Sequence, residues 1–438
     1  MLDKGVSMNS FSDWLGRVYI PGVQPTCGQR LSELLAKIEP DMVDNFFLKR
    51  HQRAITKAQA RRRELKAKKP KAYIPPLTLA FDSTSISTYS GTIGHAEYGY
   101  AKRDPHLKQV NLALACDQDT GEVVYACEYF GSIDDKTSFK PILERMQKVG
   151  FDMSETLLIT DRGCKSMSNI QKQLDVGLKF LQCTPLNEKS VRALIDKHSY
   201  QLKGIEFYEP KYHCSAVALP TEECESWSQC LPGSGSTQSV KVSVYLYYDD
   251  HKAVDEKYCE MAAIDRVLEL KNAGCQVDQE TQNHKGESVW VRKNQGIAQR
   301  LKYSGCMALR TNEVPNPFKA LELYRQRNAV ECSYRVFKNQ IEGDRMLATL
   351  TSYRGKLFVF TLATCLRTMM RVKAEAQAKE FDLKIPGNSL SQVFEILRGV
   401  TMQRWGSTDS WRISMLTRKQ RECFALFGMT PIKGTRKE

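Results

Sequence analysis

The chain has 438 residues, 42% of them hydrophobic, which is typical of a globular protein with more than one domain and excludes a disordered or fibrous chain. Its 64 lysines and arginines exceed its 50 acidic residues, so the formal net charge is +14, which favours a polyanionic partner, either nucleic acid or an acidic membrane surface. The longest strongly apolar run, residues 357–366, is too short to cross a bilayer, and the N-terminal segment lacks the apolar stretch of a signal peptide. We therefore expect a cytoplasmic protein without membrane spans.

Basic residues concentrate toward both ends of the chain. Residues 1–75 hold 15 basic and 7 acidic residues and residues 332–438 hold 19 and 9, which leaves a net charge of −4 for the middle of the chain. The densest run, residues 49–71, is compatible with a helix and is followed by prolines that indicate a linker. Closely spaced like charges repel one another unless phosphates neutralise them, so residues 1–75 are predicted to bind DNA, although a solvated helix face would have the same pattern. The cations expected to contribute are Arg61, Arg62 and Arg63.

Residues 76–183 have the pattern of an α/β domain. Apolar runs and helical periodicity predict elements in the order β-β-β-α-β-α-β. Their ranges are, in chain order, 77–83, 110–117, 123–130, 137–149, 156–160, 166–174 and 178–183. Asp82 and Asp161 are expected at the ends of two of the apolar strands. This order resembles the RNase H-like fold, in which a mixed sheet flanked by helices carries acidic side chains at one edge to hold metal ions.

Residues 184–302 do not continue this alternation and are predicted to form a β-rich insertion domain. Strand-like runs at 204–208 and 240–248 flank a polar Pro-Gly-Ser loop, and residues 253–273 have helical periodicity. The 14 cysteines of the chain include no CxxC pair, which favours reduced, buried thiols. A zinc site in this region lacks the usual ligand spacing and would have to use His213, Cys214, Cys224 and Cys230.

Residues 303–372 are predicted to complete the α/β domain with a strand at 306–310 and a long helix that begins near Pro317. At about 100° per residue, four side chains with the spacing Y-x2-R-x3-E-x6-K fall within about 60° of arc on this helix. They are Tyr324, Arg327, Glu331 and Lys338. Such a stripe suits a surface that meets a phosphate backbone beside a metal ligand, but a solvated face with an Arg327–Glu331 ion pair fits it as well.

The chain resembles DDE transposases of prokaryotic insertion sequences, in the subgroup with the Y-x2-R-x3-E-x6-K signature. The matching segments are FDST at 81–84, KRDPHLKQ at 102–109, TDRG at 160–163 and the helix just described, which keeps every signature residue. The resemblance implies an RNase H-like catalytic domain in which Asp82, Asp161 and Glu331 are the catalytic, metal-binding carboxylates. Two Mg²⁺ or Mn²⁺ ions would serve phosphodiester cleavage and transfer, with Asp82 bridging both ions and each other acid serving mainly one.

The resemblance also implies DNA-binding roles for several further residues. Those near the cleaved end would be Tyr324, Arg327, Lys338 and Arg162; those in a strand-binding loop would be Lys102, Arg103 and Lys108. Trp227 or Trp290 would stack a flipped base in members that cut through a DNA hairpin, although core packing is the favoured interpretation of each. Four other acids are interpreted as turn residues: Asp104, Asp117, Asp134 and Asp135.

Residues 373–438 are predicted to be helical, with helices at 391–397 and 417–427 and a capping box formed by Thr417 and Gln420. These helices would mediate dimerisation or complete the core of the monomer. The predicted function is cut-and-paste transposition by a homodimer that binds terminal inverted repeats and target DNA. Two alternatives stay open: a DNA-binding protein with an inactive transposase fold, and an RNase H-like nuclease that cuts without joining.

Overall fold

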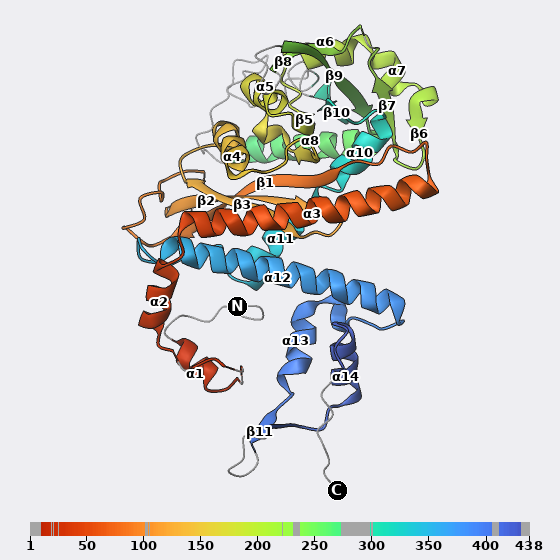
Figure 1. Cartoon of the computed structure of the whole chain (residues 1–438). Coiled ribbons are helices and arrows are strands. Elements are labelled where there is room, and N and C mark those ends of the chain that lie inside the picture. The colour runs from red at the N-terminus through yellow and green to blue at the C-terminus, as the bar shows by residue number, and fades with distance from the viewer. Residues whose placement is uncertain are drawn as a thin grey trace. The chain divides into compact units, whose positions relative to one another are not determined.

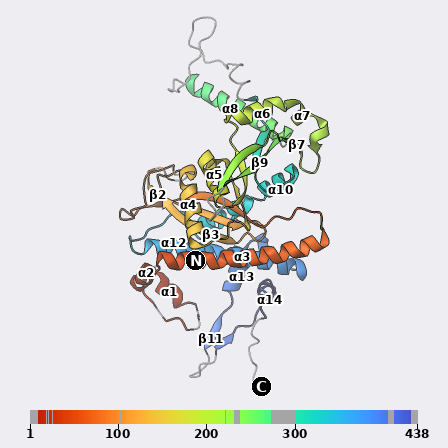
Figure 2. The same ribbon diagram turned by 45° about the horizontal axis from the view of Figure 1, so that its top comes forward.

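The structure is a computed structural model, which describes residues 10–18, 20, 22–24, 26–100, 104, 106–220, 222–230, 237–272, 298, 301–404 and 411–430. It has an α/β fold with a mixed sheet flanked by helices, which confirms the predicted fold class. The chain divides into two compact units, residues 1–158 with 326–438 and residues 159–325 (Figure 1 and Figure 2). The second unit is therefore wider than the insertion predicted at 184–302. Nowhere in the described ranges does a helix combine the length and hydropathy needed to cross a bilayer.

The first unit contains the antiparallel meander that the sequence predicted. In this meander β2 pairs antiparallel with both β1 and β3, and the order of neighbouring strands in the sheet is β3-β2-β1-β4. They are β1 (Leu77–Thr88), β2 (Lys108–Asp117), β3 (Val123–Phe130) and β4 (Thr156–Thr160), whose last two residues belong to the second unit. β1 continues beyond its predicted end at residue 83 because the residues that follow include the β-branched Thr84, Ile86 and Thr88, which favour a strand and are buried here. Asp82 thus lies inside β1, and its expected position at the strand end was wrong.

The register assigns the neighbouring helices to opposite faces of this sheet. Phe81 and Tyr125 both pair with Ala115, so their side chains point to one face. On that face Phe81 meets Phe139 of helix α4 (Asp135–Val149), with ring centroids 5.3 Å apart. Asp82 belongs to the next row and points to the other face, where helix α11 (Asn328–Arg335) packs on β1 and β2.

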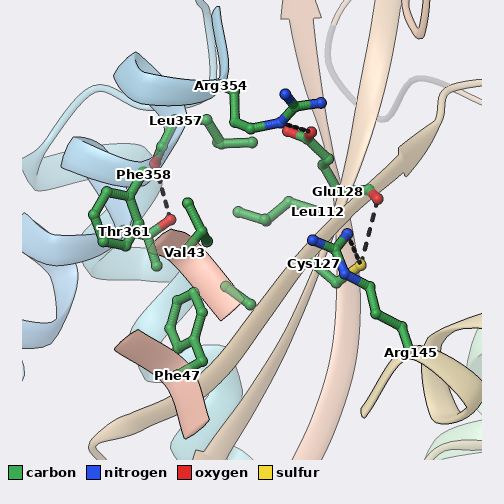
Figure 3. A pocket seen from close by; sticks show the side chains of 11 residues that line it. Val43, Phe47, Leu112, Cys127, Glu128, Arg145, Arg354, Leu357, Phe358 and Thr361 are labelled. Atoms are coloured by element: carbon green, nitrogen blue, oxygen red, sulfur yellow. Dashed lines mark hydrogen bonds and ion pairs between the residues drawn. The ribbon is translucent and has the colours of Figure 1, made fainter. Parts of the chain in front are cut away.

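Helix α3 (Pro40–Lys68) covers the edge strand β3. Arg50 Nε donates to the Val123 carbonyl oxygen at 2.7 Å, which satisfies a backbone group at the sheet edge. Phe47 of the same helix packs against Tyr125, with ring centroids 5.8 Å apart. Figure 3 shows side chains of α3, helix α12 (Tyr353–Glu380) and the strands converging on a cavity of only about 30 Å³. Close packing therefore fixes α3 to the sheet.

The second unit has its own run of antiparallel strands in the order β5-β10-β9-β7-β6, with β8 pairing on β9. They are β5 (Lys179–Thr184), β6 (Tyr208–Glu209), β7 (Cys214–Ala218), β8 (Glu225–Cys230), β9 (Thr237–Tyr248) and β10 (Cys306–Thr311). The strand predicted at 204–208 was wrong for most of its length, because residues Ile205–Phe207 form a 3₁₀ turn. The strands predicted at 240–248 and 306–310 are confirmed.

Helices surround these strands in the second unit. They are α5 (Met167–Asp175), α6 (Lys189–Lys197), α7 (Ser199–Lys203), α8 (Asp250–Asn272) and α10 (Pro317–Arg325). A core of Val191, Ile195, Leu202, Leu246 and Ala308 joins α6 and α7 to β9 and β10. The predicted insertion is therefore packed into the same sheet as β5 and β10.

The remaining elements lie at the two ends of the chain. They are α1 (Phe11–Leu15), α2 (Gly28–Ala36), α13 (Leu390–Arg398), α14 (Arg418–Ala425) and the small hairpin of β11 (Met402–Arg404) and β12 (Trp411–Ile413). The predicted capping box of Thr417 and Gln420 begins α14. Leu390, Val393 and Leu426 pack with Ala374 of α12. This packing supports the monomer-core interpretation of the C-terminal helices.

Candidate active site

The predicted signature helix is interrupted in the structure. α10 ends at Arg325, α11 begins at Asn328, and a π-helical turn follows at Val336–Gln340. At the start of α11, the Ala329 and Val330 amides donate to carbonyl groups three residues earlier, at Gln326 and Arg327, which tightens the backbone there. The prediction of one continuous helix was therefore wrong, and Tyr324 belongs to the second unit, whereas the other three signature residues belong to the first.

In the first unit, Arg327 joins two of the predicted acids. Its Nη1 lies 3.5 Å from Asp82 Oδ2, and its Nη2 lies 3.0 Å from Glu331 Oε1. The Arg327 side chain is only 14% exposed, whereas that of Glu331 is 49% exposed. A strand residue and a helix residue far apart in sequence thus meet one guanidinium. The Arg327–Glu331 pair is the i,i+4 ion pair that the sequence allowed.

Asp82 is held in place through the backbone around it. Its Oδ1 accepts a hydrogen bond from the Ser83 amide at 2.8 Å. Its carbonyl oxygen lies 2.7 Å from the hydroxyl of Tyr334, which also accepts from the Leu114 amide at 3.0 Å. Burial raises the pKa of Tyr334 well above its ordinary value, so this hydroxyl keeps its proton and can donate it.

Tyr334 is a residue of the candidate site that the sequence pattern did not indicate. It lies three residues after Glu331 on α11, so the helix that carries the acid also carries the hydroxyl that binds β1 and β2. The only sequence signal was its helical spacing from Glu331. That signal does not say which strand the tyrosine meets.

Asp135 also has a role that the sequence did not predict. Its Oδ1 accepts from Tyr129 Oη at 2.7 Å and from the hydroxyl of Ser83, the residue after Asp82. Burial, and then the charge of Asp135, raise the pKa of Tyr129. The turn interpretation was therefore incomplete for Asp135, which supports β1 next to the candidate site.

Asp134 and Asp117 have the local roles that were expected, whereas Asp104 has a partner far away in the sequence. Asp134 caps α4 by accepting from the Thr137 amide at 2.8 Å, and hydrogen bonds from Thr137 lower the pKa of Asp134. Asp117 accepts from the Asp119 amide at 3.1 Å in the turn between β2 and β3. Asp104 pairs with Arg345 at 3.2 Å.

In the second unit, Asp161 directly follows β4, as predicted. Its Oδ1 accepts from the Arg162 amide at 2.7 Å and from the Tyr324 hydroxyl at 3.0 Å. Tyr324, expected to contact DNA, therefore orients one of the predicted metal-binding carboxylates. Arg162 is exposed to solvent beside it.

The remaining candidates are placed as follows. Lys338 is half-buried in the π-helical turn, and Lys108 is the half-buried first residue of β2. Arg61 forms an ion pair with Asp119, Arg62 is half-buried and Arg63 is exposed. Lys102, Arg103 and Trp290 lie outside the described residues.

Trp227 packs as a partly buried residue of the second unit. It lies in β8 against a cluster that includes Ile170, Phe180 and Val242. Its Nε1 donates to Glu225 Oε2 at 3.2 Å. Both contacts hold the indole ring within the protein, and they favour the core-packing interpretation.

Side chains that could bind a metal ion are not clustered where the structure is described. Within those ranges, no three His, Cys, Asp or Glu residues are grouped so that they could hold a metal ion. Cys214 of the alternative zinc set is buried in β7, and burial raises the pKa of its thiol. A neutral thiol of this kind is a poor zinc ligand.

Comparison with known proteins places these features in a family. No curated protein matches the chain. A solved structure with some likeness is the cryo-EM structure of the piggyBac transposase synaptic complex with hairpin DNA, at 10% identity and a TM-score of 0.37, covering 84% of this chain and 72% of that one. Residues 74–364, which are most of the chain, match the family model described as the transposase DDE domain. The chain belongs to the DDE transposase family.

Proposed function

We propose that this transposase cuts DNA at the terminal inverted repeats of a mobile element and joins the freed ends to target DNA, in the manner of the prokaryotic insertion-sequence subgroup with the Y-x2-R-x3-E-x6-K signature. The observation that supports this most is the meeting of Asp82 and Glu331 at one guanidinium, in a chain whose family carries out DNA transposition. The sequence predicts the same metal-binding role for both residues. The acting form is proposed to be a homodimer.

The residues that would hold metal ions are Asp82, Asp161 and Glu331. Carboxylate oxygens are the donors that Mg²⁺ and Mn²⁺ prefer, so the residue types fit two such ions. When bound, the ions would activate the attacking oxygen and stabilise the leaving oxygen of the phosphodiester.

The chain's own side chains would orient the acids and the DNA. Arg327 spans Asp82 and Glu331, so its fork of donors is suited to a phosphate brought to the same carboxylates. Tyr324 would keep Asp161 in one rotamer through its hydroxyl. Further phosphate contacts are proposed for Arg162, Lys338, Lys108, Lys102 and Arg103, with base stacking kept for Trp290.

The test is a cleavage assay on DNA that carries the inverted repeats of the element, with Mg²⁺, Mn²⁺ or EDTA. We expect nicking only with a divalent ion, and its loss in Asp82→Asn, Asp161→Asn and Glu331→Gln, while each variant still binds the DNA. Glu395→Gln removes an exposed carboxylate from α13 and is the matched control, which should cleave normally. Full activity in any of the three variants would remove that acid from the site.

The same assay separates the two alternatives. Binding of end-containing DNA without cleavage under any metal condition would favour an inactive, DNA-binding transposase fold. Cleavage without joined product, when a target plasmid is supplied, would favour a nuclease that does not transfer strands. Either outcome would overturn the proposal of cut-and-paste transposition.

A further inference from the structure

The cations of α3 fall into two classes, which the sequence could not separate. Those that face the sheet are neutralised there: Arg50 Nη2 lies 3.2 Å from Glu122 Oε2, and Arg61 pairs with Asp119. Lys57, at the border, lies 3.4 Å from Glu122 Oε1. These contacts tie α3 to the turn between β2 and β3.

The cations on the outer side of α3 have no such partners. Lys49, Arg53 and Arg63 are exposed, and the structure gives none of them an ion pair within the residues it describes. The nearest acid on the outer side, Glu64, is paired with Lys68 at 2.6 Å. The charge of the outer side is therefore left uncompensated by the protein.

The spacing of the outer cations places them in one line. These cations and the small residues between them follow one another at alternating steps of four and three residues. This spacing keeps all of them on one face of the helix. The line is Lys49, Arg53, Thr56, Ala60, Arg63 and Ala67, and we call it the outer stripe of α3. At about 1.5 Å per residue, Lys49 and Arg63 are about 21 Å apart along the axis. A DNA duplex carries one phosphate charge per about 1.7 Å of its axis, so it presents several phosphates over that length.

We propose that the outer stripe of α3 binds the phosphate backbone of duplex DNA, independently of sequence. The small side chains between the cations allow a duplex to approach closely, and no large apolar side chain is present in the stripe to insert into a lipid surface. The inner ion pairs hold the helix in place, so little conformational freedom is lost when the phosphates bind. This inference rests on the proposed action on DNA, and it reassigns Arg61 from DNA contact to structural support.

The experiment measures the affinity of the full chain for a random-sequence duplex at several salt concentrations, without divalent ions. The test variant is Lys49→Gln/Arg53→Gln/Arg63→Gln. The control, Lys379→Gln/Lys384→Gln/Lys419→Gln, removes the same charge from exposed lysines of the same unit. Because each phosphate contact contributes about 0.9 to the slope of log affinity against log salt, we expect the test variant to lose about 2.7 of slope and the control to keep its slope.

A charge-preserving variant guards against misfolding. Lys49→Arg/Arg53→Lys/Arg63→Lys should keep nearly the wild-type slope, because a phosphate needs only a positive charge at each position. Equal slopes for the test variant and the control would overturn the inference and leave the transposase proposal intact. Failure of the wild-type chain to bind any DNA would instead overturn the proposed function.

Discussion

At the scale of single residues, Arg327 partly neutralises the charges of two acids, Asp82 and Glu331. It is the cation that Asp82 and Glu331 share, and it carries one positive charge close to both. If these carboxylates hold a divalent ion, as proposed, the positive charge of the guanidinium would oppose its binding, and a phosphate that paired with Arg327 would weaken that opposition. Arginine is suited to this exchange because its fork of donors fits carboxylate and phosphate equally.

We predict that Arg327→Gln binds Mn²⁺ more tightly than wild type in the absence of DNA. Removing one unit charge a few ångströms from exposed acids changes the binding free energy by about 1 kcal/mol, which is roughly a fivefold change in affinity. Isothermal titration calorimetry measures it, and Arg371→Gln is the matched control because Arg371 pairs with Glu375 on α12. Cleavage of DNA should fall in Arg327→Gln at the same time. Weaker Mn²⁺ binding in this variant would contradict the proposed exchange.

Tyr334 provides a second test at this scale. Tyr334→Phe removes the hydroxyl that accepts from the buried Leu114 amide and that lies 2.7 Å from the Asp82 carbonyl oxygen. An amide left without a partner in the core costs about 1–3 kcal/mol of unfolding free energy. Urea unfolding should show this loss, and nicking should decrease because Asp82 is less firmly held. Tyr200→Phe, at a side chain that is 90% exposed, should change neither property.

At the scale of elements, alternation and helical spacing predicted most of the described strands and helices. β1, β4 and β10 were found from apolar runs, and the α14 capping box from two residues three apart. The break between α10 and α11 was not predictable, because it contains neither glycine nor proline and the side-chain periodicity continues through it. The links of Ser83 to Asp135 and of Tyr334 to β1 were equally hidden, since they join residues that only the folded sheet brings together.

The anchoring of α3 predicts how stability depends on pH. His51 of this helix is buried, stacks on Phe151 at 4.3 Å between ring centroids, and has Nε2 3.1 Å from Thr156 Oγ1. Burial lowers the pKa of His51 from 6.5 to about 4, against a smaller opposing effect of the Asp152 charge. Between pH 6.5 and 4, the unfolded chain therefore binds a proton at His51 that the folded chain does not bind. Stability that is fully present above pH 6.5 is lost as the pH falls toward 4.

We expect the unfolding free energy to fall by up to about 3 kcal/mol from this group between pH 6.5 and 4. His51→Gln cannot be protonated, so its stability should depend less on pH across that range, whatever its absolute value. His106→Gln, at an exposed histidine, should leave the pH dependence unchanged. Urea unfolding at a series of pH values measures all three proteins. An unchanged pH dependence in His51→Gln would show that another group is responsible.

At the scale of the whole molecule, almost all of the net positive charge belongs to the first unit. Residues 159–325 hold 22 basic and 21 acidic residues, which leaves 42 basic and 29 acidic residues in the first unit. The first unit therefore has a net charge of +13 and the second of +1. A field of this asymmetry steers a polyanion to the first unit before any specific contact forms.

This asymmetry predicts where a duplex of random sequence protects the chain. We consider hydrogen–deuterium exchange at low salt and without divalent ions. Peptides from residues 49–68, the segment of α3 that contains the outer stripe, should exchange more slowly when the duplex is added. Peptides from α6 and α7, residues 189–203, should not change, because the second unit is nearly neutral. Raising the salt concentration should remove the protection, since a bound duplex releases counterions. Protection of 189–203 without protection of 49–68 would mean that shape or specific contacts, and not the net charge of the first unit, decide where DNA first binds.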